Sequence, residues 1–293
     1  MTLRDLRQEY HGSVTPGDFD LLAAFSFGTT KEAIMREPDR VIDNESSSDL
    51  RHLLDRRAAR EPVAYIVGER EFYGLPFSVT RDTLVPRPET EHLVEEAIGL
   101  LSETAPDSVV IDLGSGSGAI AVSVAHATSK KETGDGRVRF FATDLSSAAL
   151  EIAKRNTDRH GVDRLITFFE GNLLDPIPEG AFIDALRVVI LANLPYLSRD
   201  IYESADDDVR LYEPESALVA DDDGLALYIE LLDDLVRKRN SAWSDKQVDG
   251  LFEIGPEQSE RIAGEFASRF PDGTSDIVPD LSGRQRVFRF RIG

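Results

Sequence analysis

Three glycines stand at alternate positions in the segment Asp-Leu-Gly-Ser-Gly-Ser-Gly, residues 112–118. The segment overlaps the end of an apolar run, Val109–Leu113, and precedes a helix that we predict to begin at Ala119. Glycines between a strand and a helix permit a tight turn and let a ligand approach the backbone. The same string, read as Gly-x-Gly-x-x-Ala, occurs in nicotinamide-dependent enzymes, and a purely structural loop would look alike. The glycines alone therefore do not identify the ligand.

Two acidic residues favour a cationic ligand at this loop. Asp112 lies two residues before the first glycine. Asp144 ends a second apolar run, Val138–Thr143, where its carboxylate can accept hydrogen bonds from both hydroxyls of a ribose. The diphosphate of a dinucleotide favours a less acidic site, whereas S-adenosylmethionine has no phosphate and carries a positive sulfonium. We therefore expect S-adenosylmethionine.

Asn193-Leu194-Pro195-Tyr196 is the second segment whose residue types suit chemistry. It directly follows the apolar run Val188–Ala192, so it lies at the carboxyl end of a predicted strand, where open α/β sheets bind ligands. The string resembles the Asn-Pro-Pro-Tyr motif of enzymes that methylate amino or amide nitrogens. Without that resemblance, it reads as a turn followed by an aromatic core residue.

The chemistry of an amide nitrogen explains these residue types. Its lone pair is delocalised into the carbonyl group, so the nitrogen is a poor nucleophile. Two acceptors, the side-chain oxygen of Asn193 and the carbonyl oxygen of Leu194, can hold its two N–H groups and turn the lone pair toward a methyl donor. Pro195 fixes the backbone φ, and Tyr196 offers a flat wall for the substrate amide.

The N-terminal part of the sequence predicts a separate unit and a connection. Residues 1–60 are predicted to be helical, with a helix start at Thr15-Pro16 and an apolar stripe at helical spacing from Leu50. The stretch from Val63 to Thr80 is β-rich on both sides of a Gly-x-Pro turn, which predicts a β-hairpin linker.

From residue 109 on, apolar strands alternate with helices, which predicts an α/β domain with a parallel sheet covered on both faces. The predicted strands are Val109–Leu113, Val138–Thr143, Ile166–Phe169, Val188–Ala192, Leu251–Ile254 and Val287–Ile292; the predicted helices are Ala119–Ala127, Ala148–His160, Leu225–Arg239 and Glu257–Phe270; Ser129–Gly136 is expected to be a polar loop. We therefore divide the chain into a helical N-terminal domain (1–60), a β-hairpin linker (61–84) and the α/β domain (85–293).

The composition excludes several classes of site and partner. The chain has no cysteine, which rules out disulfides, thiolate zinc sites, iron–sulfur clusters and cysteine nucleophiles, and its five histidines are scattered, so no metal site is expected. With 33 basic and 54 acidic residues the formal net charge is −21, so a nucleic acid would need a local basic patch, of which only short clusters such as Arg51–Arg60 occur. No apolar run has the length of a signal peptide at the start or of a membrane span elsewhere, so we expect a cytoplasmic protein.

Over residues 61–293 the chain resembles the release factor glutamine methyltransferases (PrmC/HemK family). Beyond the two segments above, the matching stretches are Glu61–Gly68, Glu71–Gly74, Val85–Glu91, Tyr212–Leu218, Asp222–Leu225, Glu253–Gly255 and Asp280–Arg286. The first 60 residues agree only in being a helical domain of suitable length. The resemblance implies a Rossmann-like class I methyltransferase sheet of seven mostly parallel strands. It also implies methylation, with S-adenosylmethionine, of the glutamine N5 in the Gly-Gly-Gln motif of peptide-chain release factors.

The resemblance also implies roles for individual residues. Asn193, Leu194, Pro195 and Tyr196 would bind the glutamine and carry the catalysis, and the cofactor would be held by Asp112, Gly114, Ser115, Gly116, Ser117, Gly118, Asp144, Asn172, Leu173 and Asn193. Two residues depart from the family pattern. Leu194 replaces the first proline of the motif, keeping its carbonyl and adding an N–H. Asn172 stands where an acid is usual, and its amide oxygen can still accept from an adenine amino group.

Two other functions stay open from the sequence. An amino-methyltransferase could act on a nucleic-acid base or another protein, because leucine variants of the motif also suit other nitrogen acceptors; the net charge argues against a nucleic acid. A non-catalytic adaptor could retain the fold, although both motifs are intact. We expect a release factor as the protein partner, recognised in part by residues 1–60, with no direct nucleic-acid binding, no membrane association and a monomeric enzyme.

Overall fold

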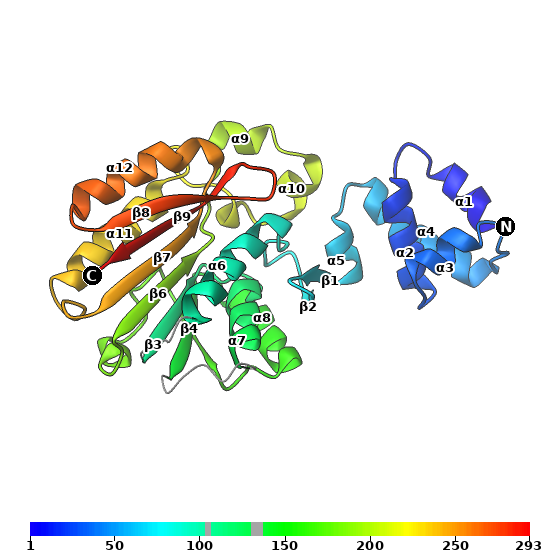
Figure 1. Cartoon of the computed structure of the whole chain (residues 1–293). Coiled ribbons are helices and arrows are strands. Elements are labelled where there is room, and N and C mark those ends of the chain that lie inside the picture. The colour runs from blue at the N-terminus through cyan, green and yellow to red at the C-terminus, as the bar shows by residue number, and fades with distance from the viewer. Residues whose placement is uncertain (103–106, 130–136) are drawn as a thin grey trace. The chain divides into compact units, whose positions relative to one another are not determined.

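The computed structural model describes residues 1–102, 107–129 and 137–293, which form two compact units (Figure 1). Unit 1 comprises Met1–Glu69 and Ala205–Glu213, and unit 2 comprises Arg70–Ser204 and Pro214–Gly293. The polar loop predicted at Ser129–Gly136 lies, apart from Ser129, outside the described residues. The predicted domain divisions at residues 60 and 84 stay predictions.

Unit 1 is helical, as its sequence predicts. Its N-terminal helices are α1 (Leu3–Glu9), α2 (Pro16–Ser26), α3 (Lys31–Arg36), α4 (Asn44–Ala58) and α5 (Val63–Val67). Helix α2 begins as expected, because the side chain of Thr15 accepts a hydrogen bond from the backbone N–H of Asp18 and Pro16 occupies the first turn. A core of apolar side chains holds these helices together, with Leu6, Leu22, Leu50 and Leu54 fully buried.

The expectation of β structure at Val63–Gly68 is wrong. These residues form the short helix α5. Pro62 precedes the helix, and Gly68 ends it in the left-handed conformation, at φ +76°. Ile66 is buried in the core of unit 1, so tertiary packing overrides the preference of its β-branched neighbours for a strand. The hairpin itself follows, as β1 (Glu69–Phe72) and β2 (Leu75–Ser78).

A short segment from later in the chain completes unit 1. Ala205–Glu213, which contains α10 (Asp207–Tyr212), clusters with the N-terminal helices although it lies within the predicted α/β domain in sequence. The hydroxyl of Tyr212 donates to the carbonyl of Ala59 at 2.7 Å, and the carboxylate of Asp208 lies 3.6 Å from the guanidinium of Arg57. These polar contacts attach the segment to the end of α4.

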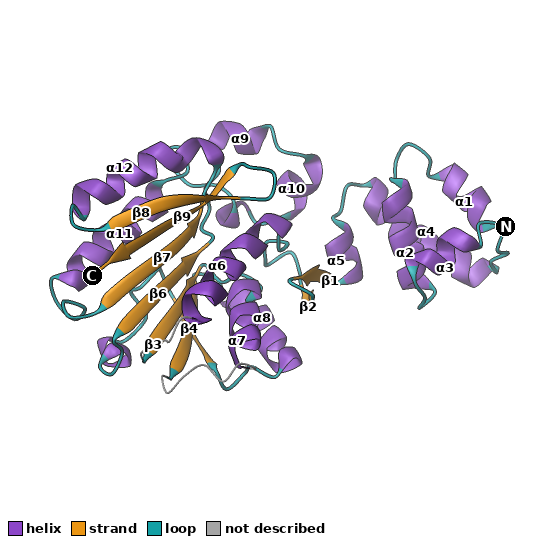
Figure 2. Ribbon diagram, in the orientation of Figure 1, coloured by secondary structure: helices purple, strands orange, loops and turns teal. Residues whose placement is uncertain are grey.

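Unit 2 is built on the seven-stranded, mostly parallel sheet that was predicted (Figure 2). The strands are β3 (Ser108–Leu113), β4 (Val138–Asp144), β5 (Ile166–Glu170), β6 (Arg187–Ala192), β7 (Gln247–Glu253), β8 (Thr274–Pro279) and β9 (Gln285–Ile292), in the spatial order β5-β4-β3-β6-β7-β9-β8. Only β9 pairs antiparallel with β7 and with β8. Strand β8, an exposed edge strand without an apolar run, was not predicted from the sequence, and β7 begins four residues before its predicted start at Leu251.

Helices cover both faces of this sheet. Those of unit 2 are α6 (Glu91–Ser102), α7 (Ala119–Ser129), α8 (Ser147–His160), α9 (Arg199–Glu203), α11 (Ala226–Arg239) and α12 (Ser259–Arg269). Side chains of α6 and α7 share one apolar core with the sheet, and those of α11 and α12 share the other. Such coverage explains why the central strands β3 and β6 are buried along their whole length.

The register of the two central strands matters most for function. Strands β3 and β6 are parallel neighbours, and Leu113 pairs with Ala192. Both strands therefore end at the same level, and the glycine segment and the Asn193–Tyr196 segment leave the sheet side by side.

One glycine of the sheet yields a prediction about stability. A Cβ at Gly250 in β7 would lie 2.1 Å from the ring of Phe290 on β9, so Gly250→Ala forces the ring to move and should lower the free energy of unfolding by about 1–3 kcal/mol. Gly264→Ala is the control, because nothing lies within 4 Å of its Cβ and alanine favours helix α12. Urea unfolding measures both; equal stability of Gly250→Ala and the parent would contradict this packing.

Candidate active site

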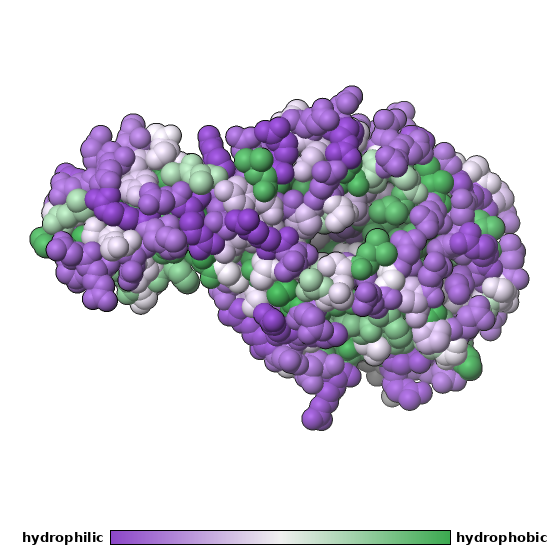
Figure 3. All heavy atoms as spheres, turned by 180° about the vertical axis from the view of Figure 1, so that it is seen from behind, coloured by the Kyte–Doolittle hydropathy of each residue, from purple (hydrophilic) through white to green (hydrophobic). Residues whose placement is uncertain are grey.

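A cavity of about 290 Å³ lies at the carboxyl ends of β3, β4 and β6. Its lining comes from six stretches of unit 2 and from Leu227 on α11; the stretches are Arg81–Leu84, Gly114 with Gly116, Asp144–Ser146 with Ala149, Gly171–Leu173, Asn193–Pro195, and Pro214 with Ser216 and Ala217. From behind the view of Figure 1, unit 2 is hollowed near its middle, with apolar and polar residues both at the rim (Figure 3). The cavity thus occupies the end of the sheet at which the sequence places its two motifs.

The glycine segment takes the conformation that its composition predicts. Gly114, Gly116 and Gly118 all have positive φ, at +67°, +55° and +78°, where other residues are strained. A Cβ at Gly114 would lie 3.1 Å from the side chain of Leu194, and one at Gly118 would lie 3.1 Å from that of Ala153 on α8. The loop is therefore both turned by its glycines and packed against the second motif.

Asp112 does not line the cavity but holds this loop through hydrogen bonds. The Ser115 hydroxyl and the backbone N–H of Ala121 both donate to its Oδ2, at 2.8 and 3.2 Å, while Oδ1 is buried without a partner among the described residues. Burial raises the pKa of Asp112 to about 7, although these two hydrogen bonds act in the opposite direction. Asp112 therefore changes its charge near neutral pH.

Asp144 lies at the cavity and connects the loop to the next strand. Its two carboxylate oxygens accept from the backbone N–H groups of Gly116 and Ser146, each at 2.8 Å. Burial raises its pKa, and the two backbone hydrogen bonds oppose that rise. Each oxygen keeps a second lone pair, so the carboxylate can still accept hydrogen bonds from a ligand.

Asn172 and Leu173 line the cavity after β5. The Asn172 side-chain nitrogen donates to the Glu230 carboxylate at 2.7 Å. This contact uses the donor end of the amide and leaves its oxygen as the free acceptor. Leu173 is buried and adopts a positive φ of +42°, which is uncommon for a leucine and marks a tightly constrained turn.

The second motif is held by side chains that sequence reasoning missed. The side-chain nitrogen of Asn193 donates to the hydroxyl of Thr90 at 3.1 Å. The N–H that Leu194 has in place of a proline donates to the hydroxyl of Tyr228 at 3.1 Å, and that hydroxyl donates to the Glu253 carbonyl. The additional N–H of Leu194 is thus satisfied inside the core.

Tyr196 faces a buried carboxylate. Its hydroxyl donates to Glu253 Oε1 at 3.2 Å, and its carbonyl accepts from Gln258 Nε2 at 2.8 Å. Burial and the neighbouring Glu253 both raise the pKa of Tyr196. A Cβ at Gly224 would lie 1.9 Å from the Tyr196 carbonyl oxygen, which explains a glycine at that position.

The structure brings most of the predicted site residues to one cavity, but not all. Those that line it are Gly114, Gly116, Asp144, Asn172, Leu173, Asn193, Leu194 and Pro195. The predicted residues outside its lining are Asp112, Ser115, Ser117, Gly118 and Tyr196. Leu145 also lines the cavity, although it was not among the predicted site residues, and it is 68% exposed. Its position directly after the predicted acid Asp144 was the one signal in the sequence that could have indicated it.

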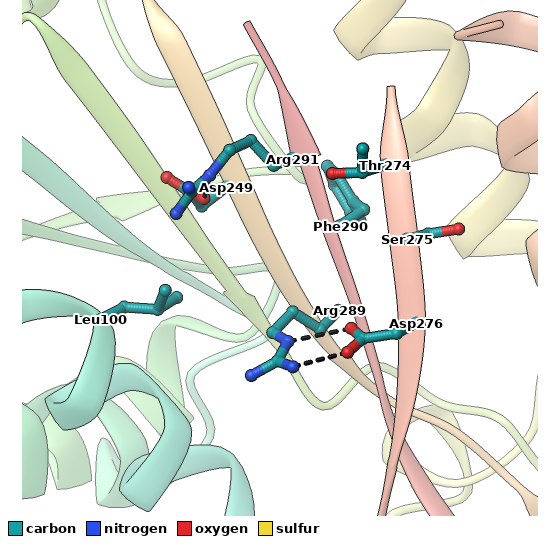
Figure 4. A pocket seen from close by; sticks show the side chains of 8 residues that line it. All are labelled: Leu100, Asp249, Thr274, Ser275, Asp276, Arg289, Phe290 and Arg291. Atoms are coloured by element: carbon teal, nitrogen blue, oxygen red, sulfur yellow. Dashed lines mark hydrogen bonds and ion pairs between the residues drawn. The ribbon is translucent and has the colours of Figure 1, made fainter. Parts of the chain in front are cut away.

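A second cavity of about 410 Å³, drawn in Figure 4, is a weaker candidate. It lies along β7, β8 and β9, away from both motifs. Arg289 pairs with Asp276 there, and Arg291 pairs with Asp249, which also binds the buried Arg187. Because these charges already neutralise one another, nothing in this cavity favours a charged ligand.

Comparison with known proteins identifies the family. Residues 7–68 match the model of the PrmC N-terminal domain, and residues 105–223 match a methyltransferase domain model. A release factor glutamine methyltransferase of Rhodopirellula baltica is 37% identical over 94% of this chain and 89% of its own length. The chain belongs to the release factor glutamine methyltransferase family. Its relative of that name in Staphylococcus aureus is 34% identical over 81% of this chain and 78% of its own length.

The fold has a wider distribution than the family. The crystal structure of the hMettl16 catalytic domain is similar with a TM-score of 0.53, at 14% identity over 81% of each chain. At that identity the likeness concerns the fold alone, and it agrees with a class I methyltransferase sheet. Within the described part of the chain, no helix is long and apolar enough to cross a membrane, and no group of three or more acidic or histidine side chains could hold a metal ion.

The buried carboxyl group of Asp112 predicts a pH dependence of stability. Its pKa is about 7 in the folded protein and 3.8 without the fold, so the folded state binds more protons between these values. Stability should therefore fall as pH rises from about 4 to 7 and then level off. Asp112→Asn should remove this slope. As pH rises from 5 to 8, the free energy of unfolding of the variant should therefore increase by about 2–3 kcal/mol relative to that of the parent.

Chemical unfolding of both proteins at several pH values measures the effect. The slope matters rather than the absolute stability, because Asn also changes the hydrogen bond from Ser115. Parallel stability curves for the two proteins would mean that Asp112 does not titrate in this range.

Proposed function

We propose that this protein transfers a methyl group from S-adenosylmethionine to the side-chain nitrogen, N5, of the glutamine in the Gly-Gly-Gln motif of peptide-chain release factors. The observation that carries the proposal is the contact between the two motifs at one cavity. Gly114 of the cofactor loop packs against Leu194, and Asn193 lines the same cavity as Asp144. A methyl donor and an amide acceptor would thus meet where two parallel strands end.

The residues around the cavity suit S-adenosylmethionine. The main-chain turn at Gly114 and Gly116 leaves room that side chains would fill, and Asp144 keeps free lone pairs for ribose hydroxyls. Asn172, fixed by Glu230, presents an oxygen that can accept from the adenine amino group. When bound, the cofactor supplies a methyl group on a positive sulfonium, and the acidic surroundings favour that charge.

Catalysis in this proposal is a matter of alignment. Asn193 Oδ1 and the Leu194 carbonyl accept from the two N–H groups of the glutamine amide, which orients the nitrogen lone pair toward the methyl group. Pro195 fixes the turn between these acceptors and Tyr196. The ring of Tyr196 would then form a flat wall for the substrate amide, and its hydroxyl is held by Glu253. No strong base is needed, because the methylated nitrogen can lose its proton to water.

The two departures from the family pattern are compatible with this role. Leu194 retains the carbonyl acceptor, and its extra N–H is bound by Tyr228. Asn172 is an amide where an acid is usual, yet its free end is an acceptor. Neither change removes a group that the mechanism uses.

The proposal extends to partners. Unit 1 has no cluster of catalytic residue types in its sequence, so we assign it to recognition of the release factor beyond the Gly-Gly-Gln loop. The substrate is then a protein, the enzyme acts as a monomer in the cytoplasm, and direct binding of nucleic acid is not required. A methylation assay with labelled S-adenosylmethionine and purified release factors, followed by mass spectrometry of the modified residue, tests the proposal as a whole.

Asp144→Ala should weaken cofactor binding. The substitution removes the acceptor for ribose hydroxyls and also the partner of the Gly116 N–H, and charge-assisted hydrogen bonds contribute about 1.5–3 kcal/mol each. Calorimetric titration with S-adenosylmethionine measures the change. If the dissociation constant stays that of the parent, Asp144 does not hold the cofactor.

Asn193→Ala should act on turnover instead. We expect kcat on release factor to fall by about 10²–10³, the usual range for losing one preorganised polar contact. Cofactor affinity should change by less than about threefold, because the glycine loop and Asp144 remain. Asn240→Ala, at the end of α11, is the control and should leave both quantities unchanged. If Asn193→Ala keeps the turnover of the parent, Asn193 does not hold the glutamine amide. A loss of activity seen only with a nucleic-acid substrate would support the alternative of a nucleic-acid amino-methyltransferase.

A further inference from the structure

The side-chain amide of Asn193 can serve the proposed function in only one of its two orientations. Its Oδ1 can accept a hydrogen bond from an N–H of a substrate amide. Its Nδ2 cannot, because both groups would then be donors. The structure places Nδ2 at 3.1 Å from the hydroxyl oxygen of Thr90, as donor to it. Thr90 ends the short 3₁₀ helix Pro88–Thr90 and is only 4% exposed, so it is a fixed partner.

The direction of that hydrogen bond depends on where the Thr90 proton goes. A hydroxyl has one hydrogen, and if Thr90 accepts from Asn193 its own hydrogen must find another acceptor. Glu253 supplies it. This carboxylate is 1% exposed; its Oε1 already accepts from Tyr196, and its Oε2 is buried without a donor at hydrogen-bond distance among the described residues. Oε2 is thus an open acceptor for a hydroxyl that turns toward it.

The electrostatics of Glu253 agree with this direction. Burial raises the pKa of Glu253, and the nearby hydroxyl of Thr90, the positive charge of Arg286 and the hydrogen bond from Tyr196 act to lower it. In the reverse arrangement, with Thr90 donating to Asn193 Oδ1, the lone pairs of the hydroxyl would face the carboxylate. That arrangement would also turn Nδ2 of Asn193 toward the substrate.

We propose that Thr90 is a positioning residue for methyl transfer: accepting from Asn193 Nδ2 and donating toward Glu253, it fixes the Asn193 amide with Oδ1 toward the substrate. The inference rests on the function proposed above. Glu253 thus sets the direction of both hydrogen bonds. The same carboxylate accepts from Tyr196, the last residue of the acceptor motif Asn193–Tyr196.

Thr90→Val and Thr90→Ser test the inference. Valine has the shape of threonine without the hydroxyl, so kcat on release factor should fall about 10- to 100-fold as the amide loses its fixed orientation. KM and the cofactor dissociation constant should change by less than about threefold. Serine retains the hydroxyl and should restore most of the turnover. Thr128→Val, which removes another buried hydroxyl from α7, controls for loss of packing and should keep parental turnover.

A double-mutant cycle separates positioning from general disturbance. If Thr90 acts through Asn193, adding Thr90→Val to Asn193→Ala should lower kcat no further, and additive losses would overturn the inference. Parental turnover of Thr90→Val, or a loss that serine does not restore, would also overturn it. Absence of release factor methylation by the parent would instead refute the proposed function, so the two failures are distinguishable.

Discussion

The pairing of β3 with β6 is the constraint on which the site depends. Parallel strands in register end together, and here the pair Leu113 and Ala192 is followed directly by the two motifs. No loop has to span a distance to bring them together, because the backbone hydrogen bonds of the sheet already do so. The close packing of Gly114 against Leu194 follows from the same geometry. A residue larger than glycine at position 114 would be strained by the positive φ and would push the side chain of Leu194 aside by a few tenths of an ångström.

The acceptor motif is in turn anchored to groups that lie far from it in sequence. Thr90 precedes α6, Tyr228 lies on α11, and Glu253 ends β7, so three elements converge on four residues. Glu253 takes part twice, through its side chain with Tyr196 and through its carbonyl with Tyr228. This arrangement keeps polar groups in a core that would otherwise penalise them, since each donor meets an acceptor.

The sequence predicted those features whose signal is contiguous. The glycine loop, the Asn193–Tyr196 motif and the buried strands are each a run of neighbouring residues, and their local pattern sufficed. Strand β8 is a polar edge strand that has no such pattern. Helix α5 has the composition of a strand, and its packing in the fold makes it helical. Thr90, Tyr228 and Glu253 could not be linked to Asn193 because their contacts arise only when distant segments fold together.

The return of residues 205–213 to unit 1 means that the chain passes between the units three times. It crosses after Glu69, after Ser204 and after Glu213. The N-terminal helices are therefore not a module that a single cut removes, since Tyr212 and Asp208 hold to Ala59 and Arg57. A chimera that exchanges residues 1–69 with those of a relative would have to exchange this segment as well, and the two stretches are expected to evolve as one.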